Sequence, residues 1–286
     1  MRIADRRVRT FLRNRSAVAG LVFLSVVVVA ALGAPVLAPF HPETRVEEAG
    51  AVLVRAAPSA AHLLGTDENG FDVFSRVLYG ARTSLLTAVA SIGLALVVAV
   101  PLGAVAGWRG GWVASLILRA TDVALAFPSI FLAVSIAAIR GQRELLTVIY
   151  AVAAVSVPPI LRQVRAAVLQ VKANDFVTAA RAIGHSPARI VVRTVLPNCL
   201  APILVLATLG TGAAILDAAG LSFLGLGPPP AAAEWGVMLT NGFRDALDPD
   251  LWFLLVPPGA AIAVTVLGFN LFGDGLRDAL DPRTSR

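Results

Sequence analysis

The chain alternates between long apolar runs and shorter polar segments. A helix needs about 20 residues to cross the hydrocarbon core of a bilayer, because each residue rises by about 1.5 Å. The pattern therefore predicts an all-α, polytopic membrane protein with six transmembrane helices. We place these helices at residues 17–40, 83–108, 112–139, 145–159, 198–223 and 251–272.

Polar stretches flank and connect these helices. We expect a cytoplasmic N-terminal tail at residues 1–16, an external segment at 41–80, a cytoplasmic loop at 161–197 and an external loop at 224–250. Residues 83–286 would then form a five-helix core. The periodicity also predicts amphipathic helical stretches outside the apolar runs, at residues 72–79, 159–172 and 235–247.

The stretch at 159–172 has one apolar face, made by residues at helical spacing: Leu161, Val164, Val168 and Val171. Its basic residues lie off that face: Arg162, Arg165 and Lys172. We therefore interpret this stretch as an extension of the fourth helix that packs through its apolar side.

Positive charges favour one side of this arrangement. Of the 24 basic residues, the expected topology puts six in the N-terminal tail, six in residues 161–197, three in the C-terminal tail and two near the first inner turn, Arg109 and Arg119. Only seven fall on the other side. Because basic residues accumulate on the cytoplasmic side of membrane proteins, both termini are predicted to be cytoplasmic.

Composition excludes several other classes of protein. Hydrophobic residues make up 57% of the chain, charged residues 15%, and the mean hydropathy is +0.78, outside the range of soluble domains. The net charge of +6 is explained by membrane topology, so no nucleic acid is expected. A single cysteine, Cys199, and three scattered histidines give no metal-ligand spacing, so no metal site is expected.

One polar island, residues 175–197, interrupts the apolar runs. Asn174 or Asp175 is expected to cap a first short helix, which Gly184 ends because glycine tolerates the left-handed conformation. Ser186 is expected to cap a second helix. Small and apolar residues fall on one face of the first helix, where another protein's backbone can approach closely: Ala179, Ala180 and Ile183. We interpret the island as a docking element.

The island resembles the cytoplasmic EAA loop of ABC importer permeases, which carries an alanine pair, a glycine and a Leu-Pro pair in this order. The matching positions here are Ala179, Ala180, Gly184, Leu196 and Pro197. Other stretches resemble permeases of the peptide/nickel import family, specifically their C-type subunit: residues 64–85, 221–230, 235–236 and 270–283.

This resemblance implies the type I ABC importer permease fold and a permease subunit for peptides in the bacterial inner membrane. The implied partners are a homologous permease subunit, two cytoplasmic ATPase subunits or domains, an external substrate-binding protein and membrane lipid. ATP would be bound by the partners, so no cofactor is expected in this chain. It contains no GxxxxGK[ST] loop for phosphate, and Lys172 is its only lysine, so we expect no enzyme activity.

Three positions depart from the family pattern. Phe71 stands where the family usually has an arginine after the glycine, so a salt bridge from that position is not carried over. Thr178 stands where the EAA loop has glutamate, so docking by shape is carried over but a charge contact is not. In the fifth helix, members of the family usually have an acidic residue three positions before Leu-Ser-Phe. In this chain that position is occupied by Ala218. The acid in this chain is Asp217, about 100° further round the helix.

Charges inside membrane helices cost roughly 2.5 to 3.5 kcal/mol each on insertion scales. Arg119 and Asp122 are three residues apart and are expected to pair on one helix face, as a gate or as a structural pair. Asp217 is a candidate for gating or the substrate path, or a structural acid. These three residues also allow an alternative function, an ion-coupled secondary carrier, although no clear internal repeat accompanies them.

Overall fold

The computed structural model describes residues 11–48, 50–245 and 247–280. The helices in these ranges are α2 (Arg15–Leu37), α3 (Val73–Arg109), α4 (Gly111–Ala126), α5 (Ser129–Arg140), α6 (Leu145–Lys172), α7 (Asp175–Ala182), α8 (Pro187–Ile190), α9 (Leu196–Phe223), α10 (Trp235–Arg244) and α11 (Trp252–Leu280). A π-helical turn, η1 (Val191–Val195), a 3₁₀ turn, η2 (Pro249–Leu251), and a small antiparallel hairpin of β1 (Glu47–Glu48) and β2 (Ala51–Val52) join them. The all-α fold class is confirmed.

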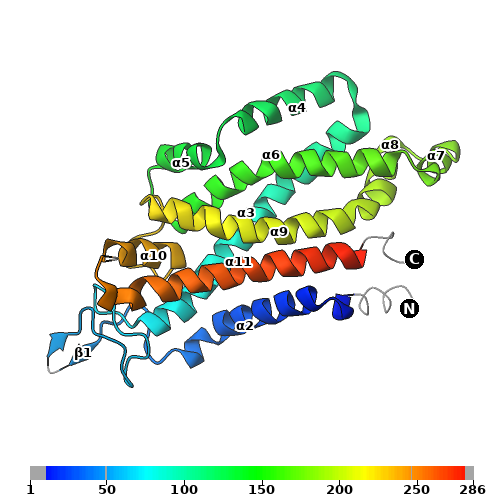
Figure 1. Cartoon of the computed structure of the whole chain (residues 1–286). Coiled ribbons are helices and arrows are strands. Elements are labelled where there is room, and N and C mark those ends of the chain that lie inside the picture. Colours follow the sequence, from blue (N-terminus) through cyan, green and yellow to red (C-terminus); the bar gives the residue numbers. More distant parts are fainter. Residues whose placement is uncertain (1–10, 49, 246, 281–286) are drawn as a thin grey trace.

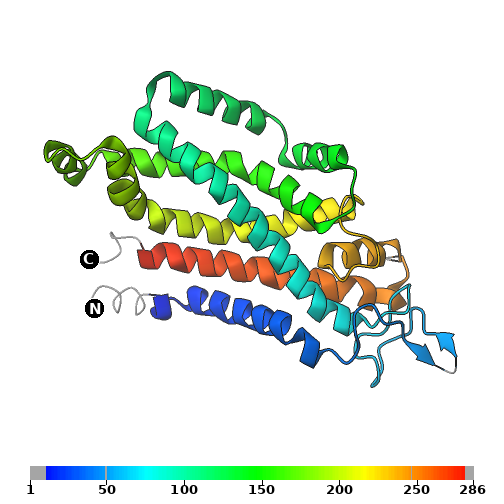
Figure 2. The same ribbon diagram turned by 180° about the vertical axis from the view of Figure 1, so that it is seen from behind.

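Four long helices lie side by side in one layer, in the order α6, α9, α11 and α2 (Figure 1). Helix α3 crosses the back of this layer, as Figure 2 shows, and packs most extensively on α6. Helix α4 lies along the free side of α6, while α10 packs against α9 and α11 at one end of the bundle. The other end carries α7 and α8, and α2 begins and α11 ends toward this same end.

Five helical segments are long and apolar enough to cross a membrane: Arg15–Leu37, Val73–Arg109, Leu145–Lys172, Pro187–Phe223 and Pro249–Leu280. The expectation of one helix over residues 112–139 is wrong, because α4 and α5 meet at an angle of 94°. Pro128 explains the break, since proline holds the preceding residue in an extended conformation, and Phe127 has φ −90° and ψ 137°. Counted as one bent span, α4 and α5 bring the total to six.

Two helices extend beyond their predicted bounds. Helix α3 begins ten residues early because Asp72 caps it, accepting a hydrogen bond from the Ser75 backbone N–H at 2.8 Å. The amphipathic stretch at 72–79 is thus continuous with the second predicted helix. Helix α11 continues to Leu280, past the predicted end at 272. The arginines of residues 1–10 and 281–286, which entered the charge count, lie outside the described residues.

Candidate functional site

The extension of α6 packs on α3 through a seam of small residues. Leu161, Val164 and Val168 are at most 2% exposed, as the periodicity predicted. Opposite them α3 presents glycines: a Cβ on Gly103 would lie 2.9 Å from the Leu161 carbonyl oxygen, and one on Gly107 would lie 2.7 Å from Val168 Cγ1. Only glycine allows so close an approach. The two helices therefore form one packed unit that leads to the polar island.

The island, residues 175–197, is called the coupling segment from here on. Its first helix, α7, follows a turn in which the Asn174 amide donates to the carbonyls of Gln170 and Val171. Gly184, with φ +82°, reverses the chain after α7. Ser186 then caps α8, accepting a hydrogen bond from the Arg189 backbone N–H. The helix-turn-helix predicted from Gly184 and Ser186 is present. Asn174 stands at the N-cap of α7, but its side chain makes no capping hydrogen bond because its amide donates back to the end of α6.

Helix α7 has an inner and an outer face. Val177 and Ala180 are buried, at 0% and 8% exposure, and belong to the same apolar core as the long helices. Phe176, Ala179 and Ile183 are exposed. The expectation that Ala180 shares the outer face with Ala179 is therefore wrong, because Ala180 lies three residues from Val177 and turns inward with it. The outer face is small at Ala179 and apolar at Ile183.

A continuous helix joins α8 to α9 through the π-helical turn. Pro197 has no backbone N–H, so the ordinary bond to the carbonyl of Arg193 cannot form. The N–H of Leu196 reaches five residues back to the Val191 carbonyl instead, which widens the turn. Leu196 packs against the core, whereas Pro197 is exposed. Of the predicted coupling residues, those open to a partner are Thr178, Ala179, Gly184 and Pro197.

The charges predicted as a gate or relay do not come together. Asp122 on α4 accepts a hydrogen bond from Arg162 Nη2 of α6 at 2.5 Å, so the predicted pair of Asp122 with Arg119 is wrong. Asp122 pairs with Arg162 because α4 packs beside α6 and Arg162 lies off the buried face of α6. Among the described residues no ion pair involves Arg119 or Asp217. Asp217 is partly buried in the last two turns of α9, at the end opposite α7.

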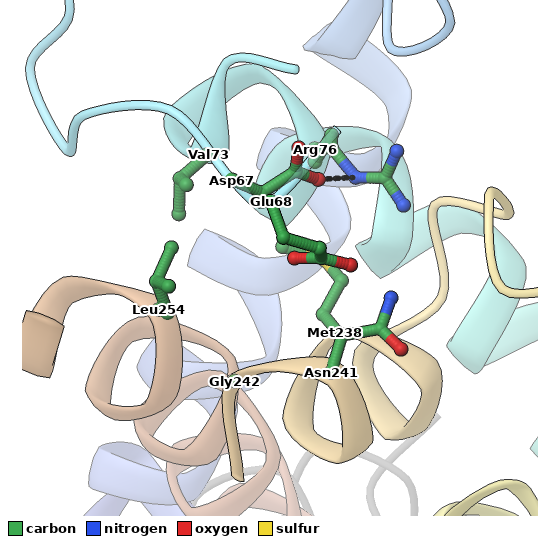
Figure 3. Close-up of a pocket in the computed structure, with 8 residues that line it drawn as sticks. All are labelled: Asp67, Glu68, Val73, Arg76, Met238, Asn241, Gly242 and Leu254. Carbon is green, nitrogen blue, oxygen red and sulfur yellow. Dashed lines mark ion pairs between the residues drawn. The ribbon is translucent and has the colours of Figure 1, made fainter. Parts of the chain in front are cut away.

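A charged cluster at the α10 end of the bundle was not foreseen (Figure 3). The Arg76 side chain is 1% exposed; its Nε lies 3.5 Å from Asp67 Oδ2, and its Nη2 donates to the Ala232 carbonyl at 2.8 Å. Glu68 lines the same small pocket, of about 10 Å³, with Asn241 of α10. Burial, then the Asp67 carboxylate, raise the pKa of Glu68 above its ordinary value. The cluster links the segment before α3 to the loop that precedes α10.

Sequence reasoning missed this cluster because its members are far apart in the chain. Asp67 and Glu68 precede α3, whereas Ala232 and Asn241 lie more than 150 residues later. One signal was available: an arginine on the apolar side of a predicted amphipathic stretch needs a buried partner, and acids stand within ten residues of Arg76. Arg162 was missed as the partner of Asp122 for the same reason: the two residues are far apart in the chain, and only the packing of α4 beside α6 brings them together.

Comparisons with known proteins cover nearly the whole chain. Residues 99–286 match the family described as "Binding-protein-dependent transport system inner membrane component", and residues 5–58 match "N-terminal TM domain of oligopeptide transport permease C". A di/tripeptide transport system permease protein of Pseudomonas aeruginosa (strain UCBPP-PA14) is 44% identical over 281 residues, which cover 96% of this chain and 90% of that protein.

Two further relatives carry similar names. A dipeptide transport system permease protein of Alkalihalophilus pseudofirmus is 43% identical over 95% of this chain and 87% of its own length. A dipeptide transport system permease protein of Escherichia coli (strain K12) is 44% identical over 96% of this chain and 91% of its own length. The similarity thus includes both the coupling segment and the helices on either side of it.

Proposed function

We propose that this chain carries short peptides inward across the membrane. The premise is that the chain belongs to the family of binding-protein-dependent transport system inner membrane components. Within this family it is a C-type permease of the ABC peptide importers. The relatives named above are described as dipeptide or di/tripeptide permeases and are 43% to 44% identical over almost the whole chain. These names support dipeptides and tripeptides as the substrate class. The chain is a multi-pass protein of the inner membrane.

The observation that carries the proposed coupling role is the position of α7. This helix lies at one end of the bundle, anchored from inside by Val177, with Ala179 and Ile183 exposed on its outer side. A short helix with a small and apolar outer face fits a groove on a partner protein. In our proposal the partner is a cytoplasmic ATPase subunit, and ATP is bound there, so this chain needs no cofactor and has no ATPase site of its own.

The arrangement of the helix ends supports the proposed orientation, and the remaining partners in our proposal are those that the family resemblance implies. The start of α2 and the end of α11 lie at the end of the bundle that carries α7 (Figure 1). If α7 meets a cytoplasmic ATPase, both termini are cytoplasmic too, as the charge count predicted. A homologous permease subunit would complete the translocation path, two ATPases would drive it, and an external binding protein would deliver the peptide at the α10 end.

The mechanism we propose is alternating access. Closure of the ATPases displaces α7, and the packed unit of α3 and α6 carries the movement into the membrane. The ion-coupled carrier has less support, because Asp122 is paired with Arg162 on a neighbouring helix instead of with Arg119.

The test uses two glycines with matched geometry. Gly184 and Gly225 both have positive φ, +82° and +76°, and neither has an atom of another residue within 4 Å of an added Cβ. Gly184→Trp and Gly225→Trp therefore cause similar backbone strain, but at opposite ends of the bundle. Each variant and the wild type are purified in mild detergent after coexpression with candidate partner ATPases, and the captured ATPase and peptide-stimulated ATP hydrolysis are measured.

Wild type and Gly225→Trp should capture ATPase subunits, and Gly184→Trp should lose most of this capture while inserting normally. Two results would contradict the proposal. One is that no ATPase follows the wild type under mild conditions. The other is that Gly184→Trp and Gly225→Trp capture it equally, which would place the docking surface elsewhere. Uptake of peptide by the chain without any ATPase would favour a secondary carrier.

A further inference from the structure

Trp108 stands where three helices meet. It lies in the last turn of α3, next to Gly107, whose close contact with Val168 fixes α6 against α3. Its ring is half-buried and packs against the apolar core. The coupling segment begins just beyond the end of α6, and this part of α6 packs on the end of α3 that carries Trp108.

Two cations from different elements lie over this one ring. The Arg181 guanidinium carbon, on α7, is 4.8 Å from the ring centroid, and Lys172 Nζ, at the end of α6, is 5.4 Å from it. Lys172 Nζ also donates a hydrogen bond to the Trp108 carbonyl oxygen at 2.7 Å. Tryptophan offers cations the most favourable aromatic face. The ring therefore links α3 to both α6 and α7.

Arg181 belongs to the inner edge of α7. It follows Val177 by four residues and Ala180 by one, so it lies on the side that faces the bundle rather than on the side of Ala179 and Ile183. A partner on the outer face leaves the contact of Arg181 with Trp108 intact. A displacement of α7 by that partner would pull on Trp108 through Arg181.

The presence of lysine, rather than arginine, at position 172 is a second observation that supports the role of this contact. The chain has 24 basic residues, and Lys172 is the only lysine among them. An ammonium group on a flexible stem can lie over the ring while donating to the carbonyl of the same residue, which a planar guanidinium does less readily. The single lysine thus stands at a position where one side chain contacts both the ring and the carbonyl oxygen of Trp108.

We propose that Trp108 is a positioning residue for energy coupling, which transmits displacement of α7 to the packed unit of α3 and α6 through Arg181 and Lys172. This inference rests on the proposed function, because it presupposes that an ATPase moves α7. The competing explanation is that Trp108 anchors the protein at the membrane surface, as tryptophans commonly do. Trp112, in the first turn of α4 and 77% exposed, suits that anchoring role better.

Trp112 gives a matched control four residues away. Hydrogen exchange of the α7 amides is first measured in the purified full-length chain for wild type, Trp108→Leu, Trp108→Phe and Trp112→Leu. Loss of two cation-π contacts in Trp108→Leu should speed this exchange by about tenfold. Trp108→Phe keeps a weaker aromatic face and should show a smaller change, and Trp112→Leu should match the wild type.

The second measurement uses the chain with its ATPases and binding protein in proteoliposomes. Trp108→Leu should still capture the ATPases, because the outer face of α7 is unchanged, but the amount of a radiolabelled dipeptide imported per ATP hydrolysed should fall by about fivefold. Trp108→Phe should restore part of this ratio. Trp112→Leu should keep it.

Three results would overturn the inference. Unchanged α7 exchange in Trp108→Leu would show that the ring does not hold α7. Equal loss of import per ATP in Trp108→Leu and Trp112→Leu would assign Trp108 to membrane anchoring. Failure of the wild type to capture any ATPase would overturn the proposed function, and the coupling role of Trp108 with it, whereas capture with unchanged α7 exchange overturns this inference alone.

Discussion

The Asp122 carboxylate of α4 lies 2.5 Å from Arg162 Nη2 of α6, and this ion pair joins two residues that are 40 positions apart in sequence. Both side chains are about half exposed in the single chain, at 58% and 51%. Since both helices are candidate parts of membrane spans, each charge is balanced chiefly by the other.

Removing one member of this pair should destabilise the protein more than removing both. Asp122→Asn leaves the Arg162 charge unpaired, and Arg162→Gln leaves that of Asp122. Each variant should lose about 1 kcal/mol of stability, since half-exposed pairs contribute modestly. The double variant should recover part of this loss, and Arg119→Gln should change little. Unfolding in detergent, followed as a double-mutant cycle, measures the coupling.

Strictly additive losses in that cycle would show that the pair contributes nothing. A large effect of Arg119→Gln, together with none for Arg162→Gln, would restore the pairing of Asp122 with Arg119 that the spacing of three residues had predicted.

The seam between α3 and α6 gives a second prediction. Gly103→Ala places a Cβ 2.9 Å from both the Leu161 carbonyl oxygen and Val164 Cβ, so the helices must separate. We expect a loss of about 1 to 3 kcal/mol in the free energy of unfolding, the usual cost of overpacking. Gly93→Ala is the control, because the same helix leaves open space around Gly93, where no such atom lies within 4 Å of an added Cβ. It should be neutral or slightly stabilising.

Equal effects of the two alanine substitutions would mean that helix propensity, and not the closeness of α3 to α6, decides stability at these positions. Thermal unfolding of both variants in the same detergent distinguishes the two cases.

What the sequence predicts well here is whatever depends on neighbours along the chain. The long apolar runs appear as helices, and Gly184 and Ser186 shape the coupling segment as expected, because a turn glycine and a capping serine act within a few residues. The prediction of the buried apolar face of α6 is also confirmed, because helical periodicity alone determines which residues share a face, whichever helix packs against it.

What it predicts poorly depends on which helix lies opposite. Asp122 has candidate partners on its own helix and on α6, and only the packing of α4 beside α6 selects Arg162. Ala180 and Ala179 are chemically identical, so the sequence could not tell that Ala180 is buried with Val177. The bend after Phe127 was visible in the sequence as Pro128, but the surrounding apolar run favoured one continuous helix.

The two faces of α7 should respond differently to mutation. Ile183 is 71% exposed, so Ile183→Ser should leave the thermal unfolding temperature within about 1 °C of the wild type, because few contacts are lost. It should nevertheless weaken capture of the ATPase, which we propose binds this face. Val177 is fully buried, and Val177→Ala should lower stability by about 1 to 2 kcal/mol.

Capture assays and unfolding curves for both variants test this separation. The coupling proposal is weakened if Ile183→Ser captures as much ATPase as the wild type. The assignment of the inner face fails if Val177→Ala unfolds at the wild-type temperature.

The cluster of Asp67, Glu68 and Arg76 predicts a dependence of stability on pH. Burial raises the pKa of Glu68 above its ordinary value of 4.5, so the folded state holds this proton more tightly than the unfolded state does. The stability that this provides is fully present below pH 4.5 and is lost as pH rises through the folded-state pKa. Glu68→Gln keeps the neutral shape, so it removes the penalty of a buried carboxylate at neutral pH.

The variant should therefore unfold about 2 °C above the wild type at pH 8, and the two should converge near pH 4.5; solvent around the half-buried carboxylate keeps the difference small. Glu47→Gln is the matched control for the loss of one carboxylate, because Glu47 is exposed in β1. A Glu68→Gln variant that is less stable than the wild type at pH 8 would mean that the charge of Glu68 is needed beside Arg76, and the sign of the prediction would be reversed.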